Sequence, residues 1–180
     1  MSKHKTRQIN RIMGATLGLI EQNGFSNLSI SNVAEAAGVT RQTIYNYFPD
    51  VESIIAQALD VHSKAMEDHQ LGLLKATEGV EQKLHVLAEF HISNASAEHS
   101  SLSLEAGLPA QAREQIVART DTIKAELAQA LAPQSTQPEV TAALLWAMIE
   151  GAAEAAAEHP KHKHYLLDTL TKAMQTIIRD

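Results

Sequence analysis

The chain contains no cysteine among its 180 residues. Disulfides and thiolate chemistry are therefore excluded, and the composition fits a reducing compartment. Its apolar stretches are interrupted by Glu, His or Lys before they reach the ~18 residues that suggest a membrane span. A signal peptide is not expected either, because the apolar residues 12–20 lead directly into a polar helix end. These absences predict a soluble, cytoplasmic protein.

The motifs that mark common enzyme active sites are also missing. The sequence holds no GxSxG, no HExxH and no glycine-rich phosphate loop, and it has no cysteine nucleophile. Its nine histidines and its glutamates show no spacing that orders them into a triad or dyad. We therefore expect no catalytic residue and no cofactor.

Hydrophobic residues make up 44% of the chain, which is enough for a sizeable core, and the net charge of −6 is unevenly spread. Residues 1–49 carry five basic and two acidic residues, whereas residues 50–180 carry ten basic and nineteen acidic ones. A basic head on an acidic body is typical of a DNA-reading domain attached to a sensing domain. A chance fluctuation in so few charges would give the same distribution.

Apolar residues recur at helical spacing along nearly the whole chain, and no segment alternates as a strand. Glycine, proline and capping residues divide this pattern into about nine helices, three short ones before Pro49 and six after it. The expected N-caps are Ser29 for helix 30–37, Thr40 for helix 41–47, and Asp50 for a long helix to about Gln70. The later helices are expected at 80–91, in a short piece ending at 107–109, and at 116–131, 139–158 and 162–178.

Residues 28–48 read LSISNVAEAAGVTRQTIYNYF. Two short helices joined by a turn at Gly38 form the helix-turn-helix arrangement, in which the second helix enters the major groove of DNA. Glycine permits the left-handed backbone conformation of such a turn. The second helix should present polar side chains to base edges and phosphates, namely Arg41, Gln42, Asn46 and Tyr47, with Thr40 and Tyr45 beside them. For Tyr45, packing against the first helix and phosphate contact both remain open.

Residues 7–59 resemble the N-terminal domain of the TetR (tetracycline repressor) family of transcriptional regulators. The shared positions include Gly24-Phe25, Val33-Ala34, the run from Ala36 to Thr40, Thr43-Ile44-Tyr45 and Tyr47-Phe48. The resemblance implies an all-α fold with an N-terminal three-helix DNA-binding domain (1–49) and a C-terminal ligand-binding and dimerisation domain (50–180). It also implies a homodimeric repressor that a small-molecule effector releases from a palindromic double-stranded DNA operator.

Two positions depart from the family pattern. Val51 stands where the family usually has a lysine that contacts a phosphate, and Pro49 stands where a basic residue often follows the phenylalanine. Phosphate anchoring is therefore expected to depend more on Lys3, Lys5 and Arg7, which form either a solvated arm or an ordered contact, and on hydroxyl groups of the motif. The candidate DNA-binding residues are Lys5, Ser29, Thr40, Arg41, Gln42, Thr43, Tyr45, Asn46 and Tyr47.

Several inward-facing positions of the helices expected after Pro49 carry polar or aromatic residues. Aliphatic residues are more usual at such positions. The candidate ligand-binding residues are His62, Met66, His69, His91, Trp146 and Glu150. The acidic body favours a cationic or neutral apolar effector, with Glu150 or Glu154 as a counter-charge. The alternatives are a metal-responsive regulator using these histidines and a helical ligand-binding protein without DNA binding.

The last two expected helices carry the features of a dimer interface. Residues 151–157 are mostly small, and the final helix has an apolar stripe of Leu166, Leu167, Leu170, Met174, Ile177 and Ile178. We expect this stripe to remain outside the core of a single chain and to pack against a second copy. A protein that binds a DNA site with two-fold symmetry also needs to be a dimer.

Overall fold

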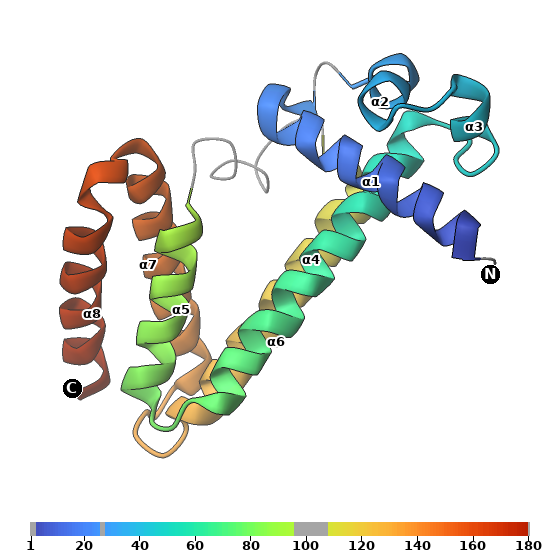
Figure 1. The fold of residues 1–180 in the computed structure, drawn as a ribbon. Coiled ribbons are helices and arrows are strands. Elements are labelled where there is room, and N and C mark those ends of the chain that lie inside the picture. The colour runs from blue at the N-terminus through green and yellow to red at the C-terminus, as the bar shows by residue number, and fades with distance from the viewer. Residues whose placement is uncertain (1–2, 26–27, 96–107, 180) are drawn as a thin grey trace. The chain divides into compact units, whose positions relative to one another are not determined.

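The computed structural model describes residues 3–25, 28–95 and 108–179, and these residues form eight α-helices and no strand (Figure 1). The helices are α1 (Lys3–Asn23), α2 (Ile30–Ala37), α3 (Arg41–Tyr45), α4 (Val51–Ala76), α5 (Val80–Asn94), α6 (Ala110–Leu131), α7 (Pro138–Glu158) and α8 (Lys163–Arg179), with a 3₁₀ turn, η2 (Pro160–His162), before α8. The all-α fold expected from the sequence is confirmed. The short piece expected to end at 107–109 falls largely outside the described residues.

Capping side chains set three of the helix starts that the sequence predicts, those of α2, α3 and α4. Ser29 and Thr40 are the N-caps of α2 and α3, and the carboxylate of Asp50 accepts the backbone N–H of Ser53 at 2.7 Å. Several predicted boundaries are wrong, since α5 continues to Asn94 and α6 already begins at Ala110. Helix α3 ends at Tyr45, and α4 runs through Gly72 to Ala76. Glycine inside a helix costs about 1 kcal/mol, but full burial of Leu74 in the same turn offsets that cost.

The described chain divides by packing into two units, one drawn from residues 1–64 and 101–117 and the other from residues 65–100 and 118–180. Two of its boundaries fall inside helices, one in α4 and one in α6. The division by packing therefore does not coincide with the functional boundary expected at Asp50, which stays a prediction.

The first unit is built around two neighbouring groups of buried side chains. One group joins α1, α2, α3 and the start of α4 through Ile12, Val33, Ala34, Ala37, Ile44, Phe48, Ile54 and Ala58. The other joins α1 and α4 to the start of α6 through Ile20, Phe25, Ile55, Leu59, Leu108 and Ala112. The small side chains of Ala34 and Ala37 allow α1 and α2 to pack closely. This core fixes the orientation of α3, because Ile44 is completely buried in it.

The second unit has one core shared by α5, α6, α7 and α8, with Leu87, Leu127, Leu145 and Met174 among its fully buried side chains. Each such side chain stabilises the fold by about 1.5–3 kcal/mol relative to exposure. The apolar stripe of α8 belongs to this core, since Leu170, Met174 and Ile178 are buried within the single chain. The expectation that this stripe is left for a second copy is therefore wrong.

Helix α7 is, among the described residues, long and apolar enough to cross a membrane by length and composition. The interruptions noted in the sequence therefore do not exclude a span at this helix. Core helices of soluble proteins pass the same test, and α7 buries Ala142, Leu145, Trp146 and Ile149 in the second unit. One face of α7 therefore packs against the core of the second unit.

Candidate functional site

Hydroxyl groups hold the two short helices of the helix-turn-helix at their N-terminal ends. Ser29 Oγ accepts the backbone N–H of Asn32 at 3.2 Å, and Thr40 Oγ1 accepts the backbone N–H of Thr43 at 3.1 Å. The Thr40 and Thr43 hydroxyls also share a hydrogen bond of 2.9 Å. All three are candidate DNA-binding residues; Ser29 and Thr40 act first as helix caps, and Thr43 bonds to the cap of α3. A capped hydroxyl retains some hydrogen-bonding capacity for a phosphate.

The turn between α2 and α3 requires glycine for its backbone conformation. Gly38 has a left-handed backbone with φ of 60°, and its N–H donates to the carbonyl of Glu35 at 3.0 Å. A Cβ added at this position would also lie 2.6 Å from Nη2 of Arg11 on α1. The guanidinium of Arg11 therefore lies against the turn. Sequence reasoning counted Arg11 among the basic residues of the head but did not place it at the motif.

The outer face of α3 offers a set of exposed polar side chains. Arg41, Gln42 and Asn46 are exposed, and Gln42 Nε2 donates to Asn46 Oδ1 at 3.4 Å. Tyr45 is 54% exposed beside them. A guanidinium pairs with the major-groove edge of guanine, and a carboxamide pairs with that of adenine. The face can therefore read base edges.

The position of Tyr47 corrects a sequence expectation. Its side chain is half-buried and packs against the core of the first unit, so only part of the ring reaches the surface, and its contact with DNA stays a prediction. The reason is local, because α3 ends at Tyr45 and the backbone N–H of Tyr47 donates to Ile44 O at 2.8 Å in the following turn. Tyr45 is thus the exposed ring of the pair, and the reading of Tyr45 as a packing residue is not supported. Thr43 is also half-buried.

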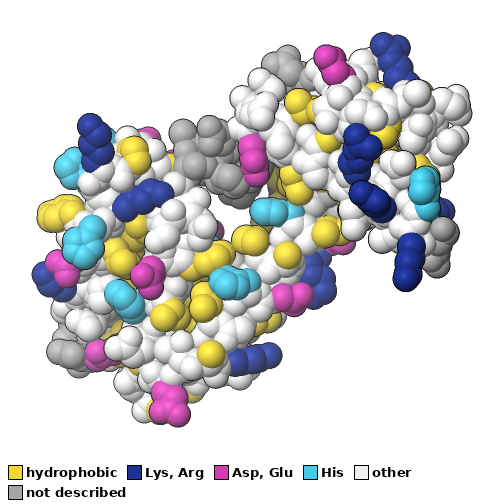
Figure 2. Space-filling model, viewed as in Figure 1, with side chains coloured by type: hydrophobic (Ala, Val, Ile, Leu, Met, Phe, Trp, Pro, Cys, Tyr) yellow, Lys and Arg dark blue, Asp and Glu magenta, His cyan; other side chains and the backbone are white. Residues whose placement is uncertain are grey.

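Basic residues of α1 extend the charged surface of the first unit. Lys3, Lys5 and Arg7 are exposed and lie within α1, so an ordered helix replaces the solvated arm considered from the sequence. Figure 2 shows Lys and Arg side chains over α1 on this face of the first unit. Lys3 and Arg7 are one helical turn apart and share a side of α1, whereas Lys5 lies on another side. Exposed cations such as these suit the phosphate backbone of DNA.

In the second unit, three of the candidate ligand-binding residues are brought together in one row of rings. We call His69, Phe90, His91 and Trp146 the aromatic row. Ring centroids are 5.1 Å apart for His69 and Phe90, 5.4 Å for Phe90 and His91, and 5.0 Å for His91 and Trp146. These distances are typical of favourable aromatic contacts. The row runs from the exposed His69 on α4 to the buried Trp146 on α7.

The inner end of the aromatic row carries polar groups in an apolar setting. His91 Nε2 lies 2.9 Å from Oε1 of the buried Gln70, so the imidazole N–H donates to the amide oxygen. Burial lowers the pKa of His91 to about 4, which leaves the ring neutral at pH 7. The indole Nε1–H of Trp146 is buried and meets no acceptor within the described part of the chain.

The other candidate ligand residues do not join this row. His62 and Met66 are half-buried on α4, with His62 in the first unit and Met66 in the second. Glu150 and Glu154 are exposed on α7, so neither serves as a buried counter-charge. No group of three or more His, Asp or Glu close enough to hold a metal ion occurs in residues 3–25, 28–95 and 108–179. The histidines therefore do not form the metal site considered as an alternative.

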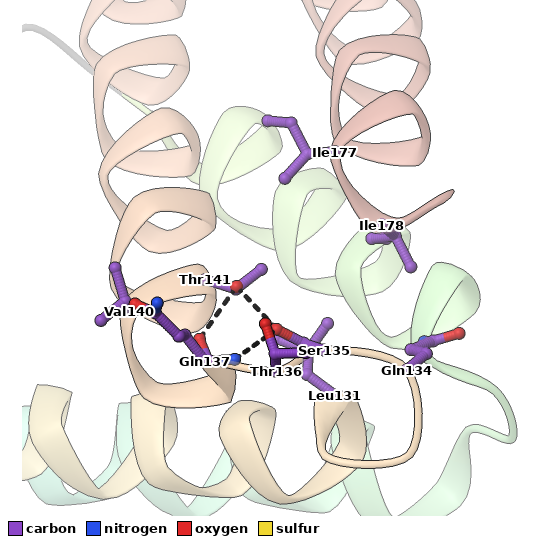
Figure 3. A pocket seen from close by; sticks show the side chains of 9 residues that line it. All are labelled: Leu131, Gln134, Ser135, Thr136, Gln137, Val140, Thr141, Ile177 and Ile178. Carbon is purple, nitrogen blue, oxygen red and sulfur yellow. Dashed lines mark hydrogen bonds between the residues drawn. The ribbon is translucent and has the colours of Figure 1, made fainter. Parts of the chain in front are cut away.

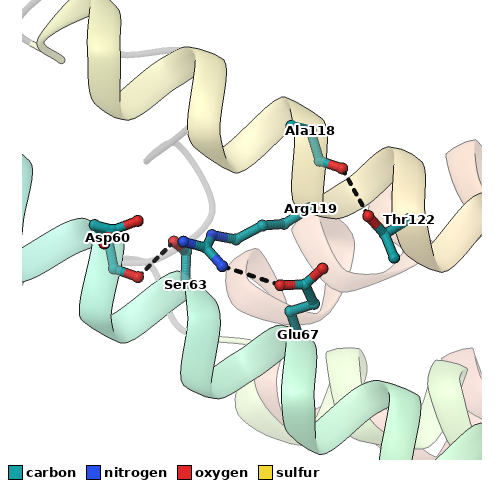
Figure 4. Close-up of polar contacts among 6 residues, drawn as sticks. All are labelled: Asp60, Ser63, Glu67, Ala118, Arg119 and Thr122. Carbon is teal, nitrogen blue, oxygen red and sulfur yellow. Dashed lines mark hydrogen bonds and ion pairs between the residues drawn. The ribbon is translucent and has the colours of Figure 1, made fainter.

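An ion pair between α4 and α6 restrains the segment of α4 that carries His69 and Gln70. Arg119 Nη1 donates to Glu67 Oε2 at 3.0 Å, and their side chains are only 17% and 12% exposed (Figure 4). An ion pair shielded to this degree is costly to break by removing one partner. The pair therefore restrains the register of α4 against α6 within the second unit.

A pocket of about 330 Å³ lies elsewhere in the second unit, at the loop between α6 and α7 (Figure 3). Its lining residues are Leu131, Gln134, Ser135, Thr136, Gln137, Val140, Thr141, Ile177 and Ile178. Ser135 Oγ and Thr141 Oγ1 share a hydrogen bond of 3.0 Å, and the Thr141 hydroxyl also bonds Gln137 O at 3.0 Å. Since these polar groups satisfy one another and none of the expected ligand residues lines the pocket, it is a weak effector site.

Comparisons with known proteins agree with the geometry of the first unit. Residues 12–58 match the family described as bacterial regulatory proteins, tetR family. An uncharacterized HTH-type transcriptional regulator of Mycobacterium bovis is 32% identical over 66 residues, which cover 37% of this chain and 35% of that protein. The chain thus aligns with about a third of that relative's length.

Two solved structures show that the likeness in fold extends over nearly the whole chain. Reduced NemR of E. coli superposes with a TM-score of 0.80 at 21% identity, covering 95% of this chain and 97% of that one. AibR, in complex with isovaleryl coenzyme A and operator DNA, superposes with a TM-score of 0.73 at 17% identity, covering 93% and 97%. The N-terminal residues 12–58 thus match the tetR family of bacterial regulatory proteins, and nearly the whole chain shares its helical fold with these solved structures.

Proposed function

We propose that the protein is a homodimeric transcriptional repressor that binds a palindromic operator through α2 and α3 and is released by a small-molecule effector. The observation that carries the proposal is the outer face of α3. Arg41, Gln42 and Asn46 are exposed there, while Ile44 on the opposite side is fully buried. A rigidly seated helix with a polar outer face is suited to the major groove.

The basic surface of α1 supplies the second element of the proposal. Lys5 and its neighbours Lys3 and Arg7 can neutralise phosphates beside the groove that α3 enters. Arg11, held against Gly38, adds a cation next to the motif. These groups compensate for Val51 and Pro49, which stand at two positions where the family often has basic residues. A protein acting on DNA in this way is expected in the cytoplasm.

The dimer is proposed to form through exposed faces of α7 and α8 in place of the buried stripe. Val140 and Leu144 of α7 are 64% and 51% exposed, and the exposed Ala147 and Gly151 continue the same helical face. An added Cβ at Gly151 would meet no atom within 4 Å. Tyr165 of α8 is 66% exposed. Exposed apolar side chains beside small ones allow a second helix to approach closely.

The effector is proposed to bind in the second unit, where the aromatic row lies. AibR, a protein of similar fold, has a structure in complex with isovaleryl coenzyme A and operator DNA, which supports this proposal. An effector releases the operator only if it binds one conformation of the dimer more tightly than another. The favoured conformation must be one that cannot contact both half-sites of the DNA.

An electrophoretic mobility shift on duplex DNA flanking the protein's own gene tests the proposal. Wild-type protein should give a discrete shift that unlabelled specific DNA removes and unrelated DNA does not. Arg41→Ala should weaken the shift, while Arg113→Ala, at an exposed arginine of α6, should leave it unchanged. A shift equally sensitive to unrelated DNA, or equal in the two variants, would contradict sequence-specific reading by α3.

A further inference from the structure

The aromatic row has a polar inner end that the fold of the described residues does not satisfy. Trp146 is 5% exposed, and its indole Nε1–H meets no acceptor in the described part of the chain. A buried donor without an acceptor is costly and uncommon. The neighbouring His91 already uses Nε2 to bond Gln70. An incoming group at this point would therefore be recognised by its ability to accept a hydrogen bond.

The surroundings of that donor determine the charge that a bound molecule can carry. His91 is neutral at pH 7, and Gln70 is an uncharged amide. The candidate counter-charges Glu150 and Glu154 are exposed on α7. Because a charge buried without a partner is strongly disfavoured, and the contacting groups His91 and Gln70 carry no charge, they favour a neutral molecule over an anion or a cation.

The outer end of the aromatic row indicates the shape of a molecule that could bind there. His69 is exposed, Phe90 and His91 are half-buried, and Trp146 is buried, so the rings run from surface to core across α4, α5 and α7. Their faces and edges present apolar and polarisable surface along this line. An apolar chain or flat ring system lying along the row would pack against them.

We propose that an uncharged carbonyl compound with an apolar body binds along the aromatic row and accepts a hydrogen bond from Trp146 Nε1. This proposal rests on the proposed function, in which such a molecule is the effector, and it names the chemical class. A ketone, ester or amide oxygen satisfies the orphaned donor, and the apolar body covers the rings.

The test uses the intact chain and Nile red, a neutral, flat, carbonyl-bearing dye whose emission shifts to shorter wavelength in apolar sites. Nile red should bind saturably. It should be displaced by 2-decanone at lower concentration than by decanoate or decyltrimethylammonium, all kept below the concentrations at which they form micelles. These three competitors carry similar apolar chains and differ in charge. Equal or better displacement by either ion would overturn the assignment of a neutral ligand.

Two variants and one control locate the binding site. Trp146→Phe keeps a ring and removes the N–H, so the dissociation constant for Nile red should rise about fivefold or more, while thermal unfolding stays cooperative. His69→Ala acts at the exposed end and should also weaken binding, which keeps the test valid if Trp146→Phe folds poorly. His164→Ala, at an exposed histidine of α8, is the matched control. Unchanged affinity in both row variants, or the same loss in the control, would overturn the site.

Operator binding without dye, measured in parallel for wild type and His69→Ala, separates this proposal from the proposed function. Loss of affinity for the dye with normal operator binding supports the aromatic row as the effector site. Saturable binding at the row by a protein that binds no specific DNA would keep the ligand site and reject the regulatory function.

Discussion

The imidazole of His91 meets the indole of Trp146 edge-on, with ring centroids 5.0 Å apart and an interplanar angle of 87°. Helices α5 and α7 contribute one residue each, and both side chains belong to the interior of the second unit. The contact places a titratable ring among apolar neighbours, so protonation of His91 and the stability of this unit are linked.

We expect the free energy of unfolding to fall as the pH drops from about 6.5 toward 4. Burial lowers the pKa of His91 to about 4 in the folded chain, whereas an unfolded histidine titrates near 6.5. The unfolded state therefore binds the proton first, and stability present above pH 6.5 is lost as the pH falls through the folded pKa. The loss should be about 2–3 kcal/mol. His91→Gln should flatten this part of the urea-unfolding profile, and equal slopes in variant and wild type would count against the linkage.

We expect Tyr45→Ala and Tyr47→Ala to behave differently. Tyr47 packs against the first core, so truncating its ring should lower the free energy of unfolding by about 1–3 kcal/mol. Tyr45 is 54% exposed, and its loss should reduce operator affinity with little effect on stability. Urea unfolding and mobility shifts on the same preparations check both outcomes. Equal stability losses would show that the two rings are buried alike.

Gly38→Ala should destabilise the protein by more than about 1 kcal/mol, because alanine at φ of 60° is strained. Arg11 Nη2 would lie 2.6 Å from the new Cβ, but it ends a flexible, exposed side chain that can move away. The loss should therefore persist in an Arg11→Ala background. Gly14→Ala is the control, since a Cβ at this helical position meets nothing within 4 Å. It should stabilise α1 by up to about 1 kcal/mol. Thermal unfolding of the four variants measures the difference, and a Gly38→Ala loss that disappears without Arg11 would contradict the backbone explanation.

Leu144→Asp and Leu170→Asp should separate the dimer interface from the core. Leu144 is 51% exposed on α7, so an aspartate there should give folded monomers if this face pairs with a second copy. Leu170 is 7% exposed, and an aspartate there buries an unpaired charge and should unfold the second unit. Sedimentation velocity and circular dichroism distinguish the cases. A folded monomer from Leu170→Asp, or an unchanged dimer from Leu144→Asp, would be incompatible with this assignment.

The amino-acid sequence by itself determined the features that depend on neighbours a few residues apart. Ser29 and Thr40 cap their helices, and Gly38 takes the left-handed turn, because their hydrogen bonds close within five residues. The helical periodicity and the helix-turn-helix follow from the same local rules, and the exposed positions of Arg41, Gln42 and Asn46 follow from helical spacing around a buried Ile44.

Only the tertiary structure decided which apolar and polar faces meet. The stripe of α8 is equally suited to a second copy or to its own core, and packing against α5 and α7 buries Leu170 and Met174 within one chain. His69, His91 and Trp146 are far apart in sequence, and Glu150 lies one turn from Trp146 yet faces outward. Helical spacing defines a face but does not say what covers it, because burial is a property of long-range contacts that depend on every helix in the unit.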